Sequence, residues 1–354
     1  MKILLKISLL LLIVTVSCQA PKQKKEVGKT EKNKMELPQS EDALLEGLSK
    51  AICYSGFRSG QHPDRGEGAK NPSYEEILED LTILSQDSMF QLIRLYDSGV
   101  NSKMVLKVIQ ENNINMKVLL GIWLDAELSA HETCEWLTEP IPKAELDSNK
   151  EKNKKEIAQG IRLANAYPQI VCAVNVGNES LVEWNDHKVD TDSIISYVNH
   201  IKSEIEQAVT VADNYKWWVN HGADLAQAVD FVSIHVYPVW EGKDLEEGIS
   251  YTIENVKEVQ AALPGRPIVI TEAGWATIAS EFGERASEEK QLKYYNWMMD
   301  WSKENNITTF FFEAFDEDWK GNTANPLGAE KHWGIFTVDR KPKLVMQEFY
   351  PALK

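Results

Sequence analysis

The chain has 354 residues, of which 43% are hydrophobic and 26% are charged, and its formal net charge at pH 7 is −16. This length and apolar content allow one large α/β domain to bury a core of its own. The strong negative charge argues against nucleic acid and polyanionic substrates as partners, so we expect a neutral ligand.

The N-terminus has the layout of a secretion signal. A basic start precedes an apolar run over residues 7–16, and Ser17 and Cys18 follow. This order is typical of a signal peptide with its cleavage region. The segment TVSC at residues 15–18 resembles the lipobox of bacterial lipoproteins, with Thr15 in place of the usual Leu. We therefore predict a lipoprotein signal peptide over residues 1–17 and a lipid anchor on Cys18, with a plain secretory signal as the alternative.

A flexible tether is predicted for residues 18–40. These residues are rich in Lys, Glu, Gln and Asn and show no apolar periodicity. Residues 1–35 hold eight lysines and two glutamates, a net charge of +6, so the rest of the chain carries −22. Residues 41–354 are predicted to fold as one domain.

Apolar runs and helical spacings alternate along this domain. Strands are expected at residues 51–54, 90–96, 117–124, 170–176, 217–219, 231–236, 267–271 and 308–312. Helices are expected after a capping box that begins at Ser73, and around residues 105–109, 157–164 and 292–299. The clearest helix is predicted over residues 192–212, where apolar side chains recur every three or four positions, at Ile194, Val198, Ile201, Ile205, Ala208 and Ala212.

Eight strands that alternate with helices predict an α/β fold with a single (β/α)8 TIM barrel. A doubly wound open sheet is the alternative, but its GxGxxG fingerprint is missing. The cysteines other than Cys18 are widely spaced, and the sequence has no CxxC pair, HExxH motif, Walker loop or GxSxG elbow. We therefore expect buried free thiols at Cys53 and Cys172, and neither a metal site nor an organic cofactor.

Carboxylates follow two of the predicted strands. The run IVITEAGWAT at residues 268–277 leads a buried strand into Glu272, and Asn178 and Glu179 follow the strand at residues 170–176. The C-terminal ends of barrel strands meet at one mouth, where barrel enzymes have their active sites. Two facing carboxylates are what glycoside hydrolysis requires, since one protonates the leaving oxygen and the other attacks the anomeric carbon or activates water.

The motifs NVGNES, ITEAGWAT and FFFEAFDEDWK resemble those of glycoside hydrolase family 17, the β-1,3-glucanases among the retaining (β/α)8 enzymes of clan A. AICYSG, LIRLYD and HWGIF agree with this resemblance, which extends from about Ala51 to about Phe336. The resemblance implies that Glu179 is the acid/base and Glu272 the nucleophile, with Arg94 supporting the nucleophile. It also implies roles in substrate binding, or at the border of the reaction subsite, for Tyr54, Tyr237, Glu317 and Lys320.

Further substrate-binding candidates come from the residues beside these motifs. Asn178 is a candidate to hold a sugar hydroxyl, and aromatic side chains near strand ends suit the apolar faces of sugar rings. The aromatic candidates are Trp275, Phe315 and Trp319, together with Trp123 and Trp240. Ser55 stands where the family usually has Gly, and Ala273 and Ala276 replace residues common in plant members; these departures alter the rim of the site.

The predicted function is retaining hydrolysis of a neutral, laminarin-type β-1,3-glucan through a covalent glycosyl-enzyme. A β-1,3-glucan transglycosylase, which passes the same intermediate to a sugar, is the alternative. A surface glycan-binding lipoprotein without activity has no need for both glutamates and is disfavoured. We expect a monomer in the cell envelope, held by its lipid anchor in the outer membrane and facing outside.

Overall fold

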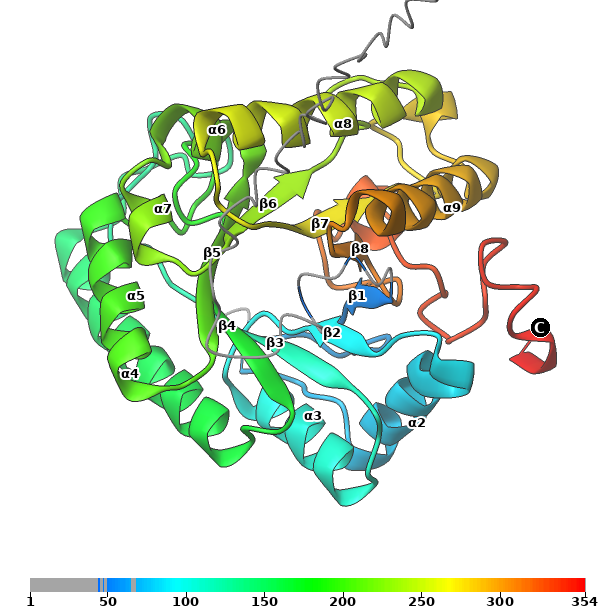
Figure 1. Cartoon of the computed structure of the whole chain (residues 1–354), viewed down its shortest axis with the longest axis horizontal. Coiled ribbons are helices and arrows are strands. Elements are labelled where there is room, and N and C mark those ends of the chain that lie inside the picture. Colours follow the sequence, from blue (N-terminus) through cyan, green and yellow to red (C-terminus); the bar gives the residue numbers. More distant parts are fainter. Residues whose placement is uncertain (1–43, 45–46, 48–49, 65–67, 354) are drawn as a thin grey trace, which may run out of the picture. The chain divides into compact units, whose positions relative to one another are not determined.

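The computed structural model describes residues 44, 47, 50–64 and 68–353. The predicted signal peptide, the lipid anchor at Cys18 and the tether over residues 18–40 lie outside these residues. Eight parallel strands form a closed barrel in sequence order, and β8 pairs with β1 to complete the ring (Figure 1). The strands are β1 (Ala51–Cys53), β2 (Leu92–Arg94), β3 (Lys117–Ile122), β4 (Val171–Asn178), β5 (Ala208–Asn214), β6 (Val232–Val236), β7 (Ile268–Gly274) and β8 (Thr309–Phe312).

Helices surround the barrel on its outer side, as Figure 1 shows. They are α2 (Tyr74–Ser85), α3 (Val100–Glu111), α4 (Lys143–Ala166), α5 (Thr191–Glu204), α6 (Tyr215–His221), α7 (Leu225–Ala228), α8 (Leu245–Ala262) and α9 (Glu288–Asn305), with short 3-10 helices at Gln86–Ser88, Gly283–Arg285, Ala329–Lys331 and Pro351–Leu353. Parallel strands buried under helices on one side and barrel side chains on the other explain the continuous apolar runs of the sequence. The predicted TIM barrel is therefore confirmed.

The first described helix begins with the predicted capping box. The Ser73 side chain accepts a hydrogen bond from the backbone N–H of Glu76, and the Glu76 side chain accepts one from the N–H of Ser73 at 2.8 Å. These two bonds satisfy N–H groups that the first turn of a helix leaves without partners. Ile77, Leu81 and Leu84 then form the buried face of α2.

The predicted fifth strand is wrong, and so is the C-terminal end of the helix before it. Helix α5 ends at Glu204, where Ile205 takes an extended conformation, and β5 occupies residues 208–214. Ala208 and Ala212 continue the helical spacing of α5 by coincidence, because a strand covered on both faces has no periodicity of its own. The predicted strand at 217–219 lies in α6, whose buried Trp218 donates from its indole N–H to the Ser233 carbonyl.

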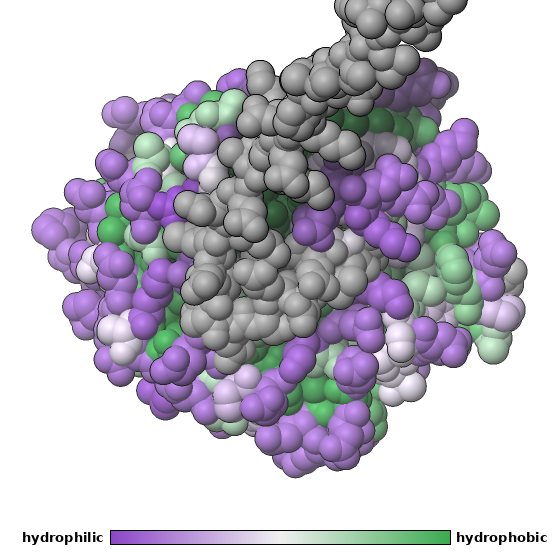
Figure 2. Space-filling view, in the orientation of Figure 1, coloured by the Kyte–Doolittle hydropathy of each residue, from purple (hydrophilic) through white to green (hydrophobic). Residues whose placement is uncertain are grey.

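The remaining surface and core features agree with the sequence. Cys53 and Cys172 are buried free thiols, as is Cys134. Hydrophilic side chains cover most of the described surface that Figure 2 shows, with smaller hydrophobic areas between them. Of the described helices, none combines the length and apolar character that crossing a bilayer requires.

Candidate active site

Glu272 lies within β7 and faces the barrel mouth in an ion pair with Arg94, the last residue of β2. Both side chains are buried, and Arg94 Nη1 lies 2.6 Å from Glu272 Oε1. Arg94 Nη1 also donates to the Thr271 carbonyl at 3.1 Å, which ties the guanidinium to the backbone of the strand that carries Glu272. Because the planar guanidinium of Arg94 donates to Glu272 inside a buried site, it fixes the orientation of the carboxylate.

Two tyrosines complete the donors around Glu272. Tyr96 donates its hydroxyl to Oε1 at 3.0 Å, and Tyr237 donates to Oε2 at 2.6 Å. Burial acts to raise the pKa of Glu272, but His235, Arg94 and the two tyrosine hydroxyls outweigh it and lower the pKa below its ordinary value. Glu272 is therefore held as a carboxylate with both oxygens oriented.

Tyr96 was not among the residues singled out from the sequence, although a signal for it was present. It lies two residues after Arg94, and successive side chains of a strand alternate between its faces, so the two share the face toward the mouth. Burial raises the pKa of Tyr96 well above its ordinary value, with the nearby Cys53 and Glu272 adding to the effect. The hydroxyl thus stays protonated and remains a donor.

Glu179 follows β4 and has a left-handed backbone conformation, with φ of 50°. Its backbone N–H donates to the Ala212 carbonyl at 2.9 Å, and Asp213 accepts from the N–H of Leu181 at 2.9 Å. These bonds from β5 hold both sides of a conformation that non-glycine residues rarely adopt. The Glu179 side chain is 23% exposed, against 7% for Glu272, so it is the more accessible of the two carboxylates.

One ring nitrogen of His235, on β6, contacts both carboxylates. Nδ1 lies 2.9 Å from Glu179 Oε1 and 3.5 Å from Glu272 Oε2. These contacts place Glu179 Oε1 and Glu272 Oε2 no more than about 6.4 Å apart, a limit compatible with the separation of about 5–5.5 Å between the carboxyl groups of retaining glycosidases. The pair of carboxylates that the sequence placed on strands four and seven is thus brought together in the barrel.

Asn178, the last residue of β4, is also part of this arrangement. Its side-chain oxygen accepts from Arg94 Nη2. Because a guanidinium only donates, this contact turns the amide NH2 of Asn178 away from Arg94. The Asn178 carbonyl lies 2.8 Å from Nε2 of His187, on which the partly exposed ring of Trp123 packs with 4.6 Å between ring centroids.

The family of this barrel follows from its sequence match. A sequence model of the BtgE/BtgC glycoside hydrolase domain matches residues 51–334. The chain belongs to this family. The match spans all eight strands and every carboxylate described above.

Curated relatives of this BtgE/BtgC-domain chain are fungal proteins. A glucan 1,3-beta-glucosidase of Arthroderma benhamiae is 27% identical over 64% of this chain and 70% of its own length. A probable glucan endo-1,3-beta-glucosidase btgC of Aspergillus clavatus is 25% identical over 77% of this chain and 39% of its own length. The chain thus spans about two fifths of the length of the btgC relatives that it matches.

Solved structures share the fold. An endo-laminarinase from Formosa Hel1_33_131 is 28% identical, with a TM-score of 0.75 and 89% of both chains covered. A β-1,3-glucanosyltransferase from Rhizomucor miehei, described as a member of glycoside hydrolase family 17, is 22% identical, with a TM-score of 0.64 over 85% of this chain and 97% of its own. At that identity the second likeness concerns the fold alone.

A second buried cluster of charges lies after β8. Lys320 Nζ lies 2.6 Å from Glu313 Oε2 and 2.7 Å from Glu317 Oε2. Glu317 also accepts from the Ser55 hydroxyl and from the Trp319 indole at 2.9 Å. Ser55, the residue that departs from the family's usual Gly, therefore has a defined contact in this cluster.

An aromatic ring connects this second cluster with the first. Lys320 Nζ lies 4.5 Å from the ring centroid of Phe312, and Phe312 packs edge-on against Tyr237 with 5.8 Å between centroids. Tyr237 is also a donor to Glu272. Both clusters therefore border the same part of the mouth.

Three of the predicted aromatic residues are buried instead of lining the mouth. The Tyr54 hydroxyl donates to Asp80 at 3.2 Å, and Phe315 packs against the Tyr54 ring. Trp275 is fully buried, with its ring against Tyr294 of α9. The prediction that Trp275 and Phe315 stack on sugar rings is therefore wrong. Alternation along β7 explains Trp275, because a residue three positions after Glu272 points to the helices.

Two other aromatic candidates remain accessible. Trp319 is partly exposed and packs edge-on against Phe57 with 5.8 Å between centroids. Trp240 is 46% exposed and packs against Phe282. Trp319, which donates to Glu317, is the one tied to a charge cluster of the mouth.

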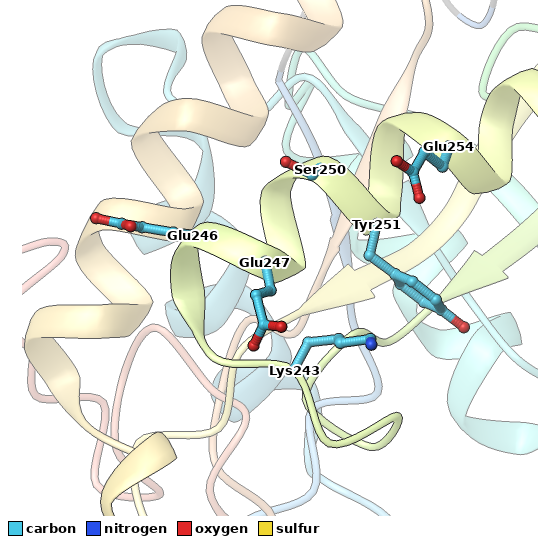
Figure 3. A pocket seen from close by; sticks show the side chains of 6 residues that line it. All are labelled: Lys243, Glu246, Glu247, Ser250, Tyr251 and Glu254. Carbon is cyan, nitrogen blue, oxygen red and sulfur yellow. The ribbon is translucent and has the colours of Figure 1, made fainter.

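An open hollow of about 390 Å³ lies on the surface of α8, away from these residues (Figure 3). Its lining consists of Lys243, Glu246, Glu247, Ser250, Tyr251 and Glu254. All of them belong to α8 or to the segment directly before it, whereas the carboxylate pair lies directly after β4 and within β7. Within the described part of the chain, no group of three or more His, Cys, Asp or Glu residues is arranged to hold a metal ion.

Proposed function

We propose that this BtgE/BtgC-domain protein is a retaining glycoside hydrolase that cleaves laminarin-type β-1,3-glucan. The observation that carries the proposal is the contact of Glu179 and Glu272 with the same nitrogen of His235. It brings together two carboxylates with unlike surroundings at a separation compatible with retention. The family match and the names of the relatives, which are β-1,3-glucosidases and an endo-laminarinase, support the choice of substrate. The motifs further support placement in glycoside hydrolase family 17.

In the first step, Glu272 attacks the anomeric carbon as the glycosidic C–O bond breaks. Glu179 gives its proton to the departing oxygen, so the leaving sugar departs as a neutral alcohol and Glu272 becomes a glycosyl ester. In the second step, the Glu179 carboxylate takes a proton from water as the water oxygen attacks the same carbon, and Glu272 is released as a carboxylate. Two inversions retain the configuration, and only glucan and water are consumed.

The surroundings of the two carboxylates fit these roles. The donors on Glu272 keep it ionised, as a nucleophile must be, and the greater exposure of Glu179 lets it reach the leaving oxygen. We assign the substrate contacts to polar and aromatic groups that border the mouth. These are the Asn178 amide and Tyr237 near the pair, and the Trp319 ring with the adjoining Glu317 and Lys320.

The test is digestion of unbranched β-1,3-glucan by the full chain, with products sized over time. Wild-type protein should release short oligosaccharides whose new reducing ends are first in the β-configuration by NMR. Glu272→Gln and Glu179→Gln should each abolish most of this release. Glu254→Gln, which changes a carboxylate of the α8 hollow, is the matched control and should retain activity. Products that are first α, or full activity of Glu272→Gln, would refute the proposal.

Glucanosyl transfer is the second candidate function. It is favoured by the structural likeness to the Rhizomucor miehei glucanosyltransferase, although that likeness concerns the fold alone. Transfer and hydrolysis share the glycosyl-enzyme and differ in whether a sugar hydroxyl or water attacks it. When the same protein is incubated with a single β-1,3-linked oligosaccharide, products longer than that oligosaccharide would identify transfer, whereas exclusively shorter products identify hydrolysis.

We also propose that the protein is a monomeric lipoprotein of the cell envelope, anchored through Cys18 in the outer membrane with the barrel outside. The sequence over residues 1–18 supports this proposal, and an external barrel suits a polymeric substrate. Labelling with a fatty-acid analogue should mark the wild type and spare Cys18→Ser. Protease added to intact cells should degrade the barrel, and light scattering of detergent-solubilised protein should report one chain; an unlabelled, protected wild type would contradict the anchor and its location.

A further inference from the structure

His235 is buried in the middle of the site and was not singled out from the sequence. It pairs in register with Glu272 across β6 and β7, and its ring also contacts groups from β2 and β4. It is two residues before Tyr237, and the alternation of strand side chains directs both to the mouth. The ring therefore touches the acid/base and the nucleophile of the proposed reaction and the arginine that supports the nucleophile.

The contacts of the ring define its tautomer. Nε2 of His235 lies 3.2 Å from Arg94 Nη1. Nη1 carries two hydrogens, which it shares among Glu272, the Thr271 carbonyl and this nitrogen, and a guanidinium has no acceptor, so the contact favours the tautomer with no proton on Nε2. The proton of the neutral ring is then on Nδ1, the nitrogen that faces Glu179 at 2.9 Å. Arg94 thus aims a single N–H bond of His235 at the two carboxylates.

We propose that His235 is a positioning residue whose Nδ1–H is shared as a hydrogen-bond donor by Glu179 and Glu272. This hydrogen bond changes its acceptor from Glu272 to Glu179 as the reaction proceeds, while the proton stays on Nδ1. The inference rests on the proposed function, since it assigns the donor that serves both carboxylates. When Glu179 holds a proton, Glu272 is the anion, and the N–H can serve its Oε2. Once Glu272 is esterified, Glu179 is the remaining anion, and the N–H supports it as the base that activates water.

Other titratable groups surround His235 and the two carboxylates. From the neighbouring elements, the groups that face the carboxylates are Arg94 and Tyr96 beside β2, Cys53 on β1, Asp213 on β5, Tyr237 after β6 and Glu330 in the loop after β8. None of them bridges both carboxylates through one atom among the contacts of the described residues, whereas His235 Nδ1 does.

Two substitutions separate the hydrogen bond from packing. The side-chain nitrogen of Asn is the same number of bonds from the backbone as Nδ1 of His, so His235→Asn can keep the donor toward Glu179. His235→Leu fills part of the space and donates nothing. We expect His235→Leu to lower kcat/KM on unbranched glucan by about 100-fold. We expect His235→Asn to lie within about tenfold of wild type.

The pH profile distinguishes positioning from a purely structural role. A carboxylate that loses a donor needs a higher pH to ionise, so both limbs of the kcat/KM profile should move to higher pH in His235→Leu and return in His235→Asn. Equal losses in both variants, with unmoved profiles, would overturn the proposal.

A measurement without substrate keeps this inference separate from the proposed function. In wild-type protein labelled with ¹⁵N histidine, the His235 ring should show a proton on Nδ1 and none on Nε2 at neutral pH, assigned by comparison with His235→Asn. A proton on Nε2 would overturn the inference even if the protein cleaves glucan. The expected tautomer in a protein that cleaves no β-1,3-glucan would instead refute the proposed substrate and leave the donor assignment standing.

Discussion

Two buried clusters of charges border the barrel mouth, and the pKa of one buried carboxylate in each moves in opposite directions, down at Glu272 and up at Glu313. Around Glu272, an arginine and two tyrosines donate to a single carboxylate, and its pKa is lowered despite burial. Around Lys320, one cation faces the two carboxylates of Glu313 and Glu317. Burial raises the pKa of Glu313 well above its ordinary value, while burial is outweighed by Lys320 and other donors at Glu317, whose pKa is lowered.

The difference shows that burial alone does not decide the charge of a carboxylate. Both Glu272 and Glu313 are almost fully buried, so both lose the solvation of water. Several donors surround Glu272, whereas Glu313 competes with Glu317 for one ammonium group and, when protonated, donates a hydrogen bond to Glu317. The number of donors for each carboxylate therefore decides the outcome. The first cluster keeps Glu272 ionised, as a nucleophile must be, and the second balances the charge of Lys320 in the loop after β8.

The largest expected effect comes from removing the cation of the first cluster. Arg94→Met leaves Glu272 buried without its partner and should lower the free energy of unfolding by about 3–5 kcal/mol, with activity lost. The double variant Arg94→Met/Glu272→Gln removes both charges and should recover much of that stability. Chemical denaturation of these two variants and of Glu272→Gln measures the coupling, and strictly additive losses would show that the pair is not coupled.

Removing one tyrosine donor should have a smaller effect. Tyr237→Phe takes away the 2.6 Å hydrogen bond to Glu272, and a bond to a charged group contributes about 1.5–3 kcal/mol, so we expect kcat/KM to fall about 10- to 100-fold. The acidic limb of the pH profile should move to higher pH, because the ionised form loses a donor. Tyr251→Phe, at the α8 hollow, is the control. An unmoved limb in Tyr237→Phe would contradict the role of this donor.

The second cluster should reveal itself in the pH dependence of stability. Glu313 is protonated in the folded protein above pH 4.5, where the unfolded chain has released that proton, so its contribution to stability is lost as the pH rises from 4.5 toward its raised pKa. This loss amounts to at most about 1.4 kcal/mol per pH unit. Glu313→Gln should remove it. Denaturation curves of both proteins from pH 4 upward that run parallel would contradict the raised pKa.

The smallest expected effect lies outside both clusters. Ser73→Ala removes the cap of α2 and should lower the free energy of unfolding by about 1 kcal/mol without changing kcat/KM. Thermal unfolding and glucan digestion measure the two quantities. A change in kcat/KM would contradict the expectation that activity depends on the charge clusters and not on the cap of α2.

Local chemistry made several features predictable. The capping box of α2 depends on residues three apart, and the apolar runs of seven of the eight strands are visible without the fold. Glu179, Glu272 and Arg94 stand at the ends of such runs, where barrel topology brings them together. The fifth strand was missed because α5 and β5 are separated by only three residues, none of them Gly or Pro. The side chains of β5 also continue the spacing of the helix.

The sequence by itself determined the barrel and the two glutamates on separate strands, because these follow from periodicity and from the order of the strands. The resemblance of its motifs to a known family implied the arginine that supports one of the glutamates. Only the tertiary structure decided which side chains meet. It placed Tyr96 and His235 on the carboxylates, and it turned Trp275 and Phe315 into the core. The reason is that a single pair of atoms in contact, such as His235 Nδ1 and Glu179 Oε1, depends on the register of strands that are far apart in sequence.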